Sequence, residues 1–99
     1  MIRTDENNEL LCPNCKGNYL HHDTVAVYSR SEDAENVTQT TISNGVLVSS
    51  LVPSSRSANP SSRRDGLTIS FWCEFCDSKP ILTVAQHKGN TQVKWTNVE

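Results

Sequence analysis

Hydrophobic and polar residues alternate with a period of two along much of the chain, which is the spacing typical of β-strands. Residues 67–73 show the pattern best, with one set of side chains for each face: Leu67, Ile69, Phe71 and Cys73 against Thr68, Ser70 and Trp72. Residues 18–30 are rich in β-branched and aromatic residues and lack a helical period. Both segments are therefore predicted as strands.

Asn44-Gly45 marks a β-hairpin, because both residues tolerate the positive φ that a type I′ turn requires. A two-residue turn at this point opposes Ile42 to Leu47 and Thr40 to Ser49. The surrounding residues, 37–52, are therefore predicted as two paired strands.

Residues 80–98 read as a second hairpin, with Gly89-Asn90 in its turn. That placement opposes Gln86 to Val93, Val84 to Trp95 and Leu82 to Asn97. Leu82, Val84, Val93 and Trp95 then share one face of the hairpin.

These elements predict an all-β fold, namely an antiparallel sheet of five to six strands. Residues 1–9 are polar and acidic and are expected to form a flexible N-terminal tail, with a single domain over residues 10–99. Residues 53–66 contain five serines, two prolines, three arginines and a glycine, so they are expected to form a long polar loop without a regular element. A loop of this length in a small domain is usually functional or disordered.

Length and charge limit the interpretation further. Ninety-nine residues with 35% hydrophobic residues can bury only a modest core. The net charge of −2 is unevenly distributed. Residues 1–50 carry three basic and seven acidic groups, and residues 51–99 carry six basic and four acidic groups. The N-terminus has no apolar run, so we expect no signal peptide and a cytoplasmic location, where structural disulfides are rare.

The four cysteines form two Cys-x-x-Cys pairs, Cys12 with Cys15 and Cys73 with Cys76. Two such pairs far apart match a four-thiolate zinc site, because two intervening residues let a tight turn aim both sulfur atoms at one ion. A thioredoxin-like pair would lead into a helix, and the sequence after Cys15 is strand-like. We therefore predict one zinc ion per chain, with iron in a rubredoxin-like site as the remaining alternative.

The order Cys-Pro-x-Cys-x-Gly, a β-rich insert and Cys-x-x-Cys resembles a zinc ribbon, in which two knuckles hold a small antiparallel sheet. The longer insert implies an elaborated version. The blocks CPNCKGNYLHH, NPSSRRDGL, FWCEFC and QHKGNT also resemble a group of small bacterial and phage proteins without an assigned activity. The resemblance therefore implies a fold and zinc. Asp77 departs from the pattern, because many knuckles have glycine after the last cysteine.

A few other residues are candidates for binding. Arg56, Arg63 and Arg64 could grip phosphates, or they could belong to a solvated loop. Trp72 could be an exposed contact, a cover for one knuckle or part of a second core layer. The three histidines, His21, His22 and His87, are expected to be strand or turn residues rather than ligands.

Three classes of function follow from this reading. We favour a binding module, such as a phage or bacterial accessory factor that docks on a host protein, with Trp72 as a contact. The alternative is a nucleic-acid-binding zinc ribbon that uses the arginines of loop 53–66. Four thiolates would close the zinc shell, and no nucleophile motif, phosphate loop or small-molecule site is evident, so we do not expect an enzyme. We also expect no membrane partner, because no stretch of the sequence could span a membrane and the net charge is small.

Overall fold

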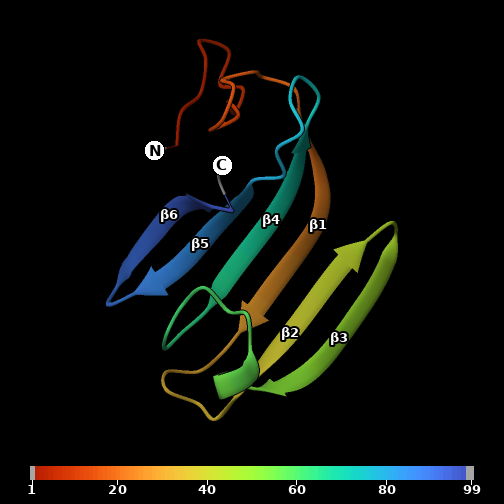
Figure 1. Ribbon diagram of the computed structural model, residues 1–99. Helices are drawn as coiled ribbons and strands as arrows, with labels where there is room; N and C mark the ends of the chain where they lie inside the picture. The colour runs from red at the N-terminus through yellow and green to blue at the C-terminus, as the bar shows by residue number, and fades with distance from the viewer. Residues whose placement is uncertain (1, 98–99) are drawn as a thin grey trace.

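The computed structural model describes residues 2–97 and shows an all-β protein built on one six-stranded antiparallel sheet. The strands are β1 (Leu20–Ser29), β2 (Asn36–Ser43), β3 (Val46–Pro53), β4 (Gly66–Cys73), β5 (Ile81–His87) and β6 (Asn90–Thr96). Their order across the sheet is β3-β2-β1-β4-β5-β6 (Figure 1). The predicted fold class is confirmed. No helix among residues 2–97 is both long and apolar enough to cross a bilayer.

The two hairpins test the predicted registers. In the first, Ile42 pairs with Leu47 and Thr40 with Ser49, as predicted. In the second, Val84 pairs with Val93 and Leu82 with Trp95, which lies two residues away from the predicted register. The turn residues are Lys88 and Gly89, at φ of 50° and 83°, rather than Gly89 and Asn90. A shift of two residues keeps each side chain on its face, so the predicted face remains correct.

Residues 4–10, which overlap the expected N-terminal tail, form a closed turn. Thr4 forms a β-bridge with Leu10, and the Leu11 N–H donates to the Arg3 carbonyl over 3.0 Å. Inside the turn, the Asp5 carboxylate accepts hydrogen bonds from the backbone N–H groups of Asn7 and Glu9. The acidic side chain that suggested a solvated tail is thus part of the turn itself.

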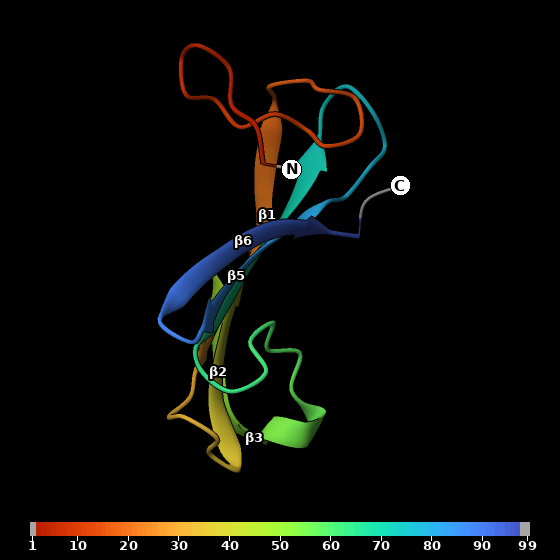
Figure 2. The same cartoon turned by 90° about the vertical axis from the view of Figure 1, so that its left-hand side faces the viewer.

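The segment between β3 and β4, residues 54–65, is one residue shorter at each end than the predicted polar loop 53–66, and it contains a short 3-10 helix, η1 (Ser54–Arg56). Ser61 is buried and donates from its hydroxyl to the Gln86 carbonyl over 2.7 Å. Asn59 donates from its side-chain amide to the Arg64 carbonyl over 2.8 Å. Side-chain hydrogen bonds therefore hold this loop, and it lies against one side of the sheet (Figure 2).

The packed core lies on the side of the sheet that this loop covers. Ala26, Tyr28 and Val37 are buried there, with Val52 packed against them. Ala58 and Pro60 of the loop line a cavity with Tyr28 and Thr83. The core is small for a chain of 99 residues, which makes a further source of stability important.

Candidate metal centre

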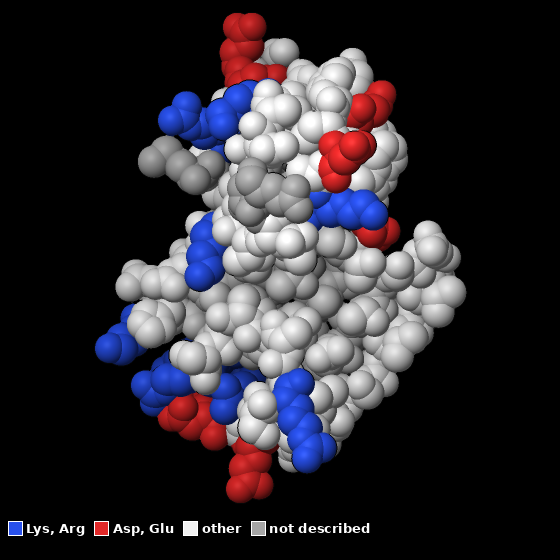
Figure 3. Space-filling model, viewed as in Figure 1, with Lys and Arg blue, Asp and Glu red and all other residues white. Residues whose placement is uncertain are grey.

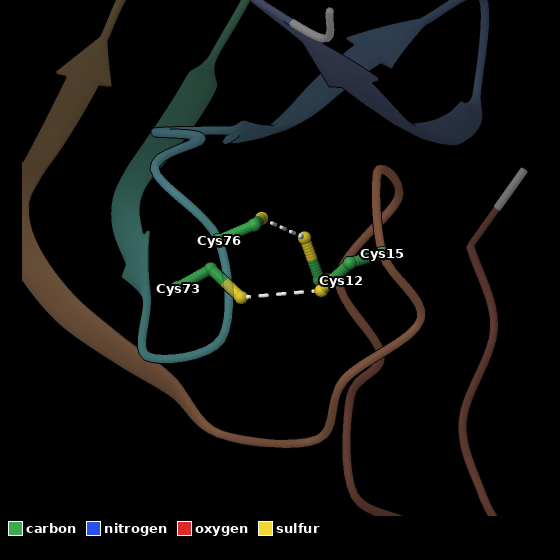
Figure 4. A group of neighbouring side chains, drawn as sticks. All are labelled: Cys12, Cys15, Cys73 and Cys76. Carbon is green, nitrogen blue, oxygen red and sulfur yellow. Dashed lines mark hydrogen bonds between the residues drawn. The ribbon is translucent and has the colours of Figure 1, made fainter.

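All four cysteines lie at one end of the sheet, where β1 begins and β4 ends (Figure 4). Cys12 and Cys15 belong to the turn that precedes β1, and Cys73 is the last residue of β4. The two strands are antiparallel neighbours, and Leu20 at the start of β1 pairs with Cys73. Strand pairing therefore brings together two cysteine pairs that are separated by residues 16–72.

The four Sγ atoms lie within 4.8 Å of one another. Cys12 and Cys76 are 3.8 Å apart and Cys15 and Cys73 are 3.5 Å apart, sulfur to sulfur. All four are free thiols. A tetrahedral ion with bonds of about 2.3 Å to sulfur holds its ligands about 3.8 Å apart. The cluster therefore has the size and the donor set of a four-thiolate metal site.

The first knuckle closes around Cys12 with two backbone hydrogen bonds. The Lys16 N–H donates to the Cys12 carbonyl over 2.9 Å, and the Cys12 N–H donates to the Gly17 carbonyl over 2.8 Å. Lys16 takes the positive φ of this turn, at 67°. Gly17 serves a different purpose, because a Cβ atom there would overlap Cδ2 of Phe75. Glycine at this position lets the ring of the second knuckle pack on the backbone of the first.

The second knuckle closes through Ser78. The Cys73 N–H donates to the Ser78 carbonyl over 3.3 Å. The buried Ser78 hydroxyl lies 3.3 Å from Sγ of Cys12 and 3.1 Å from Sγ of Cys76. Asp77 is not among the described residues with positive φ, so this turn forms without the glycine of other knuckles. Ser78 was not singled out from the sequence, and its position two residues after a ligand is the signal that could have found it.

Hydrogen bonds and burial give the thiols different pKa values. The Ser78 hydroxyl and backbone N–H lower the pKa of Cys76 to about 6. Burial raises the pKa of Cys73 to about 12. At Cys12, burial acts upward, but the Ser78 hydroxyl and the N–H groups of Cys15 and Asn14 lower the pKa overall. Hydrogen-bond donors at Cys12 and Cys76 thus favour the thiolate, the form that a metal ion binds, whereas burial at Cys73 favours the neutral thiol.

An exposed aromatic surface borders the knuckles, and we define it as Tyr19, His21, Trp72 and Phe75. Trp72 is 43% exposed and stacks on the His21 ring at 4.0 Å between centroids. Tyr19 and Phe75 are 52% and 59% exposed, and their rings stack at 5.2 Å. Trp72 also borders a small depression together with Cys76, Ser78 and Lys79. Trp72 is therefore an exposed side chain beside the second knuckle rather than part of a second core layer.

The three histidines, which were expected not to be metal ligands, lie outside the cysteine cluster. His21 contacts the Glu74 carboxylate at 2.6 Å, and His22 packs edge-on against Phe71. His87 ends β5 and pairs with Asn90 across the hairpin. These positions agree with their interpretation as strand and turn residues.

The arginines of the loop lie at the opposite end of β1 and β4 from the cysteines. Arg63 donates to both carboxylate oxygens of Asp33, at 2.8 and 2.6 Å, and also contacts Glu32. Arg64 pairs with Glu32 as well. Arg56 makes no ion pair with any residue in the described part of the chain. The structure therefore does not gather the three guanidinium groups and Trp72 into one surface.

The fold and the cysteine cluster together define the class, which is a small all-β protein with four clustered cysteines that could hold a metal ion, an arrangement consistent with a zinc-ribbon-like site. No protein-family model, no curated protein and no solved structure matches this chain. The likeness to small bacterial and phage proteins therefore stays a prediction from the sequence blocks that carry it.

Proposed function

We propose that this protein is a non-catalytic binding module that a structural zinc ion stabilises and that docks on a protein partner. The observation that carries the proposal is the arrangement of four thiols from two facing knuckles beside an exposed aromatic surface. Cys12, Cys15, Cys73 and Cys76 would hold the ion. Four thiolates complete a tetrahedral shell and leave no position for a reactive water, which is the pattern of structural zinc sites.

Both zinc and iron accept four thiolates. We favour zinc because a closed shell of four thiolates is the usual form of a structural zinc site. The ion would join the start of β1 to the end of β4. It would also hold the aromatic surface in place, because Trp72 directly precedes Cys73 and Phe75 directly precedes Cys76 in the sequence. Metal, fold and binding surface would therefore depend on one another.

The partner would contact the aromatic surface around Trp72. Exposed tryptophan is enriched among the residues that dominate binding energies, and tyrosine also occurs often there. The depression between Trp72 and the second knuckle has a volume of about 190 Å³ and is bordered by Asp77 and Lys79. A partner segment with an apolar side chain and a neighbouring charge would suit it. A phage or bacterial accessory factor in the cytoplasm is the biological setting we propose.

Nucleic-acid binding is the second candidate, and ion pairing counts against it. Arg63 and Arg64 already form ion pairs with Glu32 and Asp33, so a phosphate would have to displace a carboxylate from each arginine. On the face seen in Figure 3, the basic side chains are scattered and several lie beside acidic ones, without a continuous basic stripe. Both features favour a protein partner.

The test compares Trp72→Ala with a matched control, Val48→Ala, as bait for cross-linked capture from the source cells. Val48 is 56% exposed and lies on β3, at the far edge of the sheet. We expect Trp72→Ala to weaken capture of a defined partner by about 30-fold, as for an interface residue worth about 2 kcal/mol. Val48→Ala should capture it like the wild type.

Two results would contradict the proposal. One is equal capture by wild type and Trp72→Ala. The other is binding to duplex or single-stranded nucleic acid at low salt that is lost when Arg56, Arg63 and Arg64 are all replaced by Ala. In that case the slope of log affinity against log salt should shrink by up to about 2.7 on duplex DNA, at about 0.9 for each phosphate that the protein no longer neutralises.

A further inference from the structure

The two faces of the sheet differ in hydrophobicity, and the more hydrophobic face is the one that the polar loop does not cover. Cross-strand partners share a face of a sheet. One row of register partners runs through all six strands, and every member is a large hydrophobic residue: Leu47, Ile42, Val25, Ile69, Leu82 and Trp95. The next row consists of Ser49, Thr40, Val27, Leu67, Val84 and Val93. We call the surface formed by these two rows the apolar face.

The opposite face is much more polar. The corresponding row there is Val48, Thr41, Ala26, Thr68, Thr83 and Lys94. Loop 53–66 lies over this polar side, where Ala58 and Pro60 border Thr68 and Thr83. The protein thus uses its polar loop to cover the less hydrophobic side and leaves the more hydrophobic side open.

Exposure confirms that the apolar face is uncovered over much of its area. Leu47 and Val93 are 63% and 47% exposed, and Val27 and Ile42 are each 45% exposed. None of the twelve side chains in its two rows carries a charge. Soluble monomers rarely expose a continuous apolar surface larger than a few hundred square ångströms. A face of this kind is normally the inner side of a sandwich of two sheets.

We propose that a second copy of this chain covers the apolar face, so that two sheets pack face to face as a two-fold symmetric dimer. Six strands about 4.8 Å apart and about seven residues long at about 3.3 Å per residue give the whole side of the sheet that contains these two rows an extent of about 24 by 23 Å. Two such sides in full contact would bury a projected area of about 1,100 Å² together, and more in accessible surface. Specific interfaces begin at about 1,000 Å².

Charge also favours a second copy over a different partner. A two-fold interface places the same surface against itself, so a charge close to the axis would face its own copy. The two rows avoid this repulsion because they contain only uncharged residues. Homodimer interfaces are also more apolar than transient ones, as this face is. The aromatic surface around Trp72 lies at the metal end and remains free for the partner proposed above, so the two proposals are independent.

The test is sedimentation equilibrium of the metal-loaded chain, with Leu47→Asp and Val48→Asp as a matched pair. The two residues are neighbours on β3 with similar exposures, 63% and 56%, but they lie on opposite faces. We expect the wild type to be a dimer of two 11.0 kDa chains. Leu47→Asp should raise the dissociation constant at least about 30-fold, because two unpaired carboxylates would be buried. Val48→Asp should leave it within about twofold, because that position stays in water.

A wild type that remains monomeric at high micromolar concentration would overturn the proposal. Equal weakening by both variants would also overturn it, because that result indicates pairing of β3 edges instead. If Leu47→Asp does not fold, a soluble paramagnetic agent decides the matter on the wild type. The methyl groups of Leu47 and Val27 should be shielded and those of Val46 and Val48 accessible, and equal accessibility would refute the dimer.

Discussion

The strand pair β1–β4 is closed at its two ends in different ways. At one end, four thiols lie within 4.8 Å of one another and can share a metal ion. At the other end, residues of two loops are joined by hydrogen bonds and ion pairs in what we call the polar clasp: Arg30, Glu32, Asp33, Arg63 and Asp65. A structural zinc site supplies on the order of 10 kcal/mol to folding, whereas exposed ion pairs contribute about 1 kcal/mol or less each and are weakened by salt. We infer that the sheet depends on the metal end.

The largest expected effect is therefore the loss of the metal. Removal by a strong chelator, or the change Cys73→Ser, should abolish the sheet signal in circular dichroism at 25 °C. A site worth about 10 kcal/mol is comparable to the whole stability of a domain, about 5–15 kcal/mol, and the small core of this chain places it toward the lower end. Joining Cys15 to Cys73 also restricts the 57 residues between them (16–72), which is worth about 4 kcal/mol of unfolded-chain entropy.

Restoring zinc to the chelated wild type should restore the sheet, and it provides the control for this experiment. If the chelated protein keeps a cooperative melt within a few degrees of the metal-loaded form, then the core around Tyr28 and Val37 is sufficient alone.

A smaller effect is expected at Ser78, whose hydroxyl lies against the sulfur atoms of Cys12 and Cys76. Ser78→Ala should weaken zinc affinity about 10-fold to 100-fold, as is usual when a group that hydrogen-bonds a ligand is removed. Competition with a chromophoric chelator measures the affinity. Ser70→Ala, which removes a hydroxyl bonded to Thr24 on the sheet, is the control. Equal affinities for the wild type and Ser78→Ala would show that the hydroxyl has no influence on the metal.

Gly17→Ala tests the packing between the two knuckles. The added Cβ would overlap the Phe75 ring, so the ring must move and its stacking on Tyr19 must change. We expect a loss of about 1–2 kcal/mol in thermal unfolding of the metal-loaded protein, as for other crowded sites. The double variant Gly17→Ala, Phe75→Ala should recover part of the loss. A double variant less stable than both single variants would exclude crowding as the cause.

The smallest effect is expected at the polar clasp. Asp33→Asn removes the carboxylate that Arg63 binds, but both side chains are about half exposed, so the shift in melting temperature should be close to the limit of detection and should vanish at high salt. The Arg63 guanidinium lowers the pKa of Asp33. A folded-state pKa below the unfolded value means that this contribution is present at neutral pH and is lost as pH falls through the folded-state pKa. A large shift in melting temperature that persists in high salt would show that the polar clasp, like the metal end, contributes substantially to stability.

Local patterns predicted those parts of the fold that depend on local chemistry. Asn44-Gly45 specified both the turn and the register of the first hairpin. The second hairpin was misjudged by two residues because Lys88 adopts positive φ, which the sequence does not signal. The cysteine spacing predicted each pair of ligands, since a Cys-x-x-Cys turn carries its geometry within a few residues, and the pairing of β1 with β4 brings the two pairs together.

Features that depend on distant contacts were not predictable. The tail became a turn through Asp5, and the polar loop became a cover for the core through the buried Ser61. Pairing of the arginines with Glu32 and Asp33 depends on two loops meeting at one end of the sheet. Nor could the sequence tell which face of the sheet the loop would cover.

X-ray absorption at the metal edge, on protein purified without added metal, tests the central claim most directly, because it reports both the element and its ligands. The account predicts zinc, one ion per chain, with four sulfur neighbours at about 2.3 Å. Iron at this site would contradict the choice of metal. Nitrogen or oxygen neighbours, or a metal-free protein with oxidised cysteine pairs, would contradict the four-thiolate centre itself.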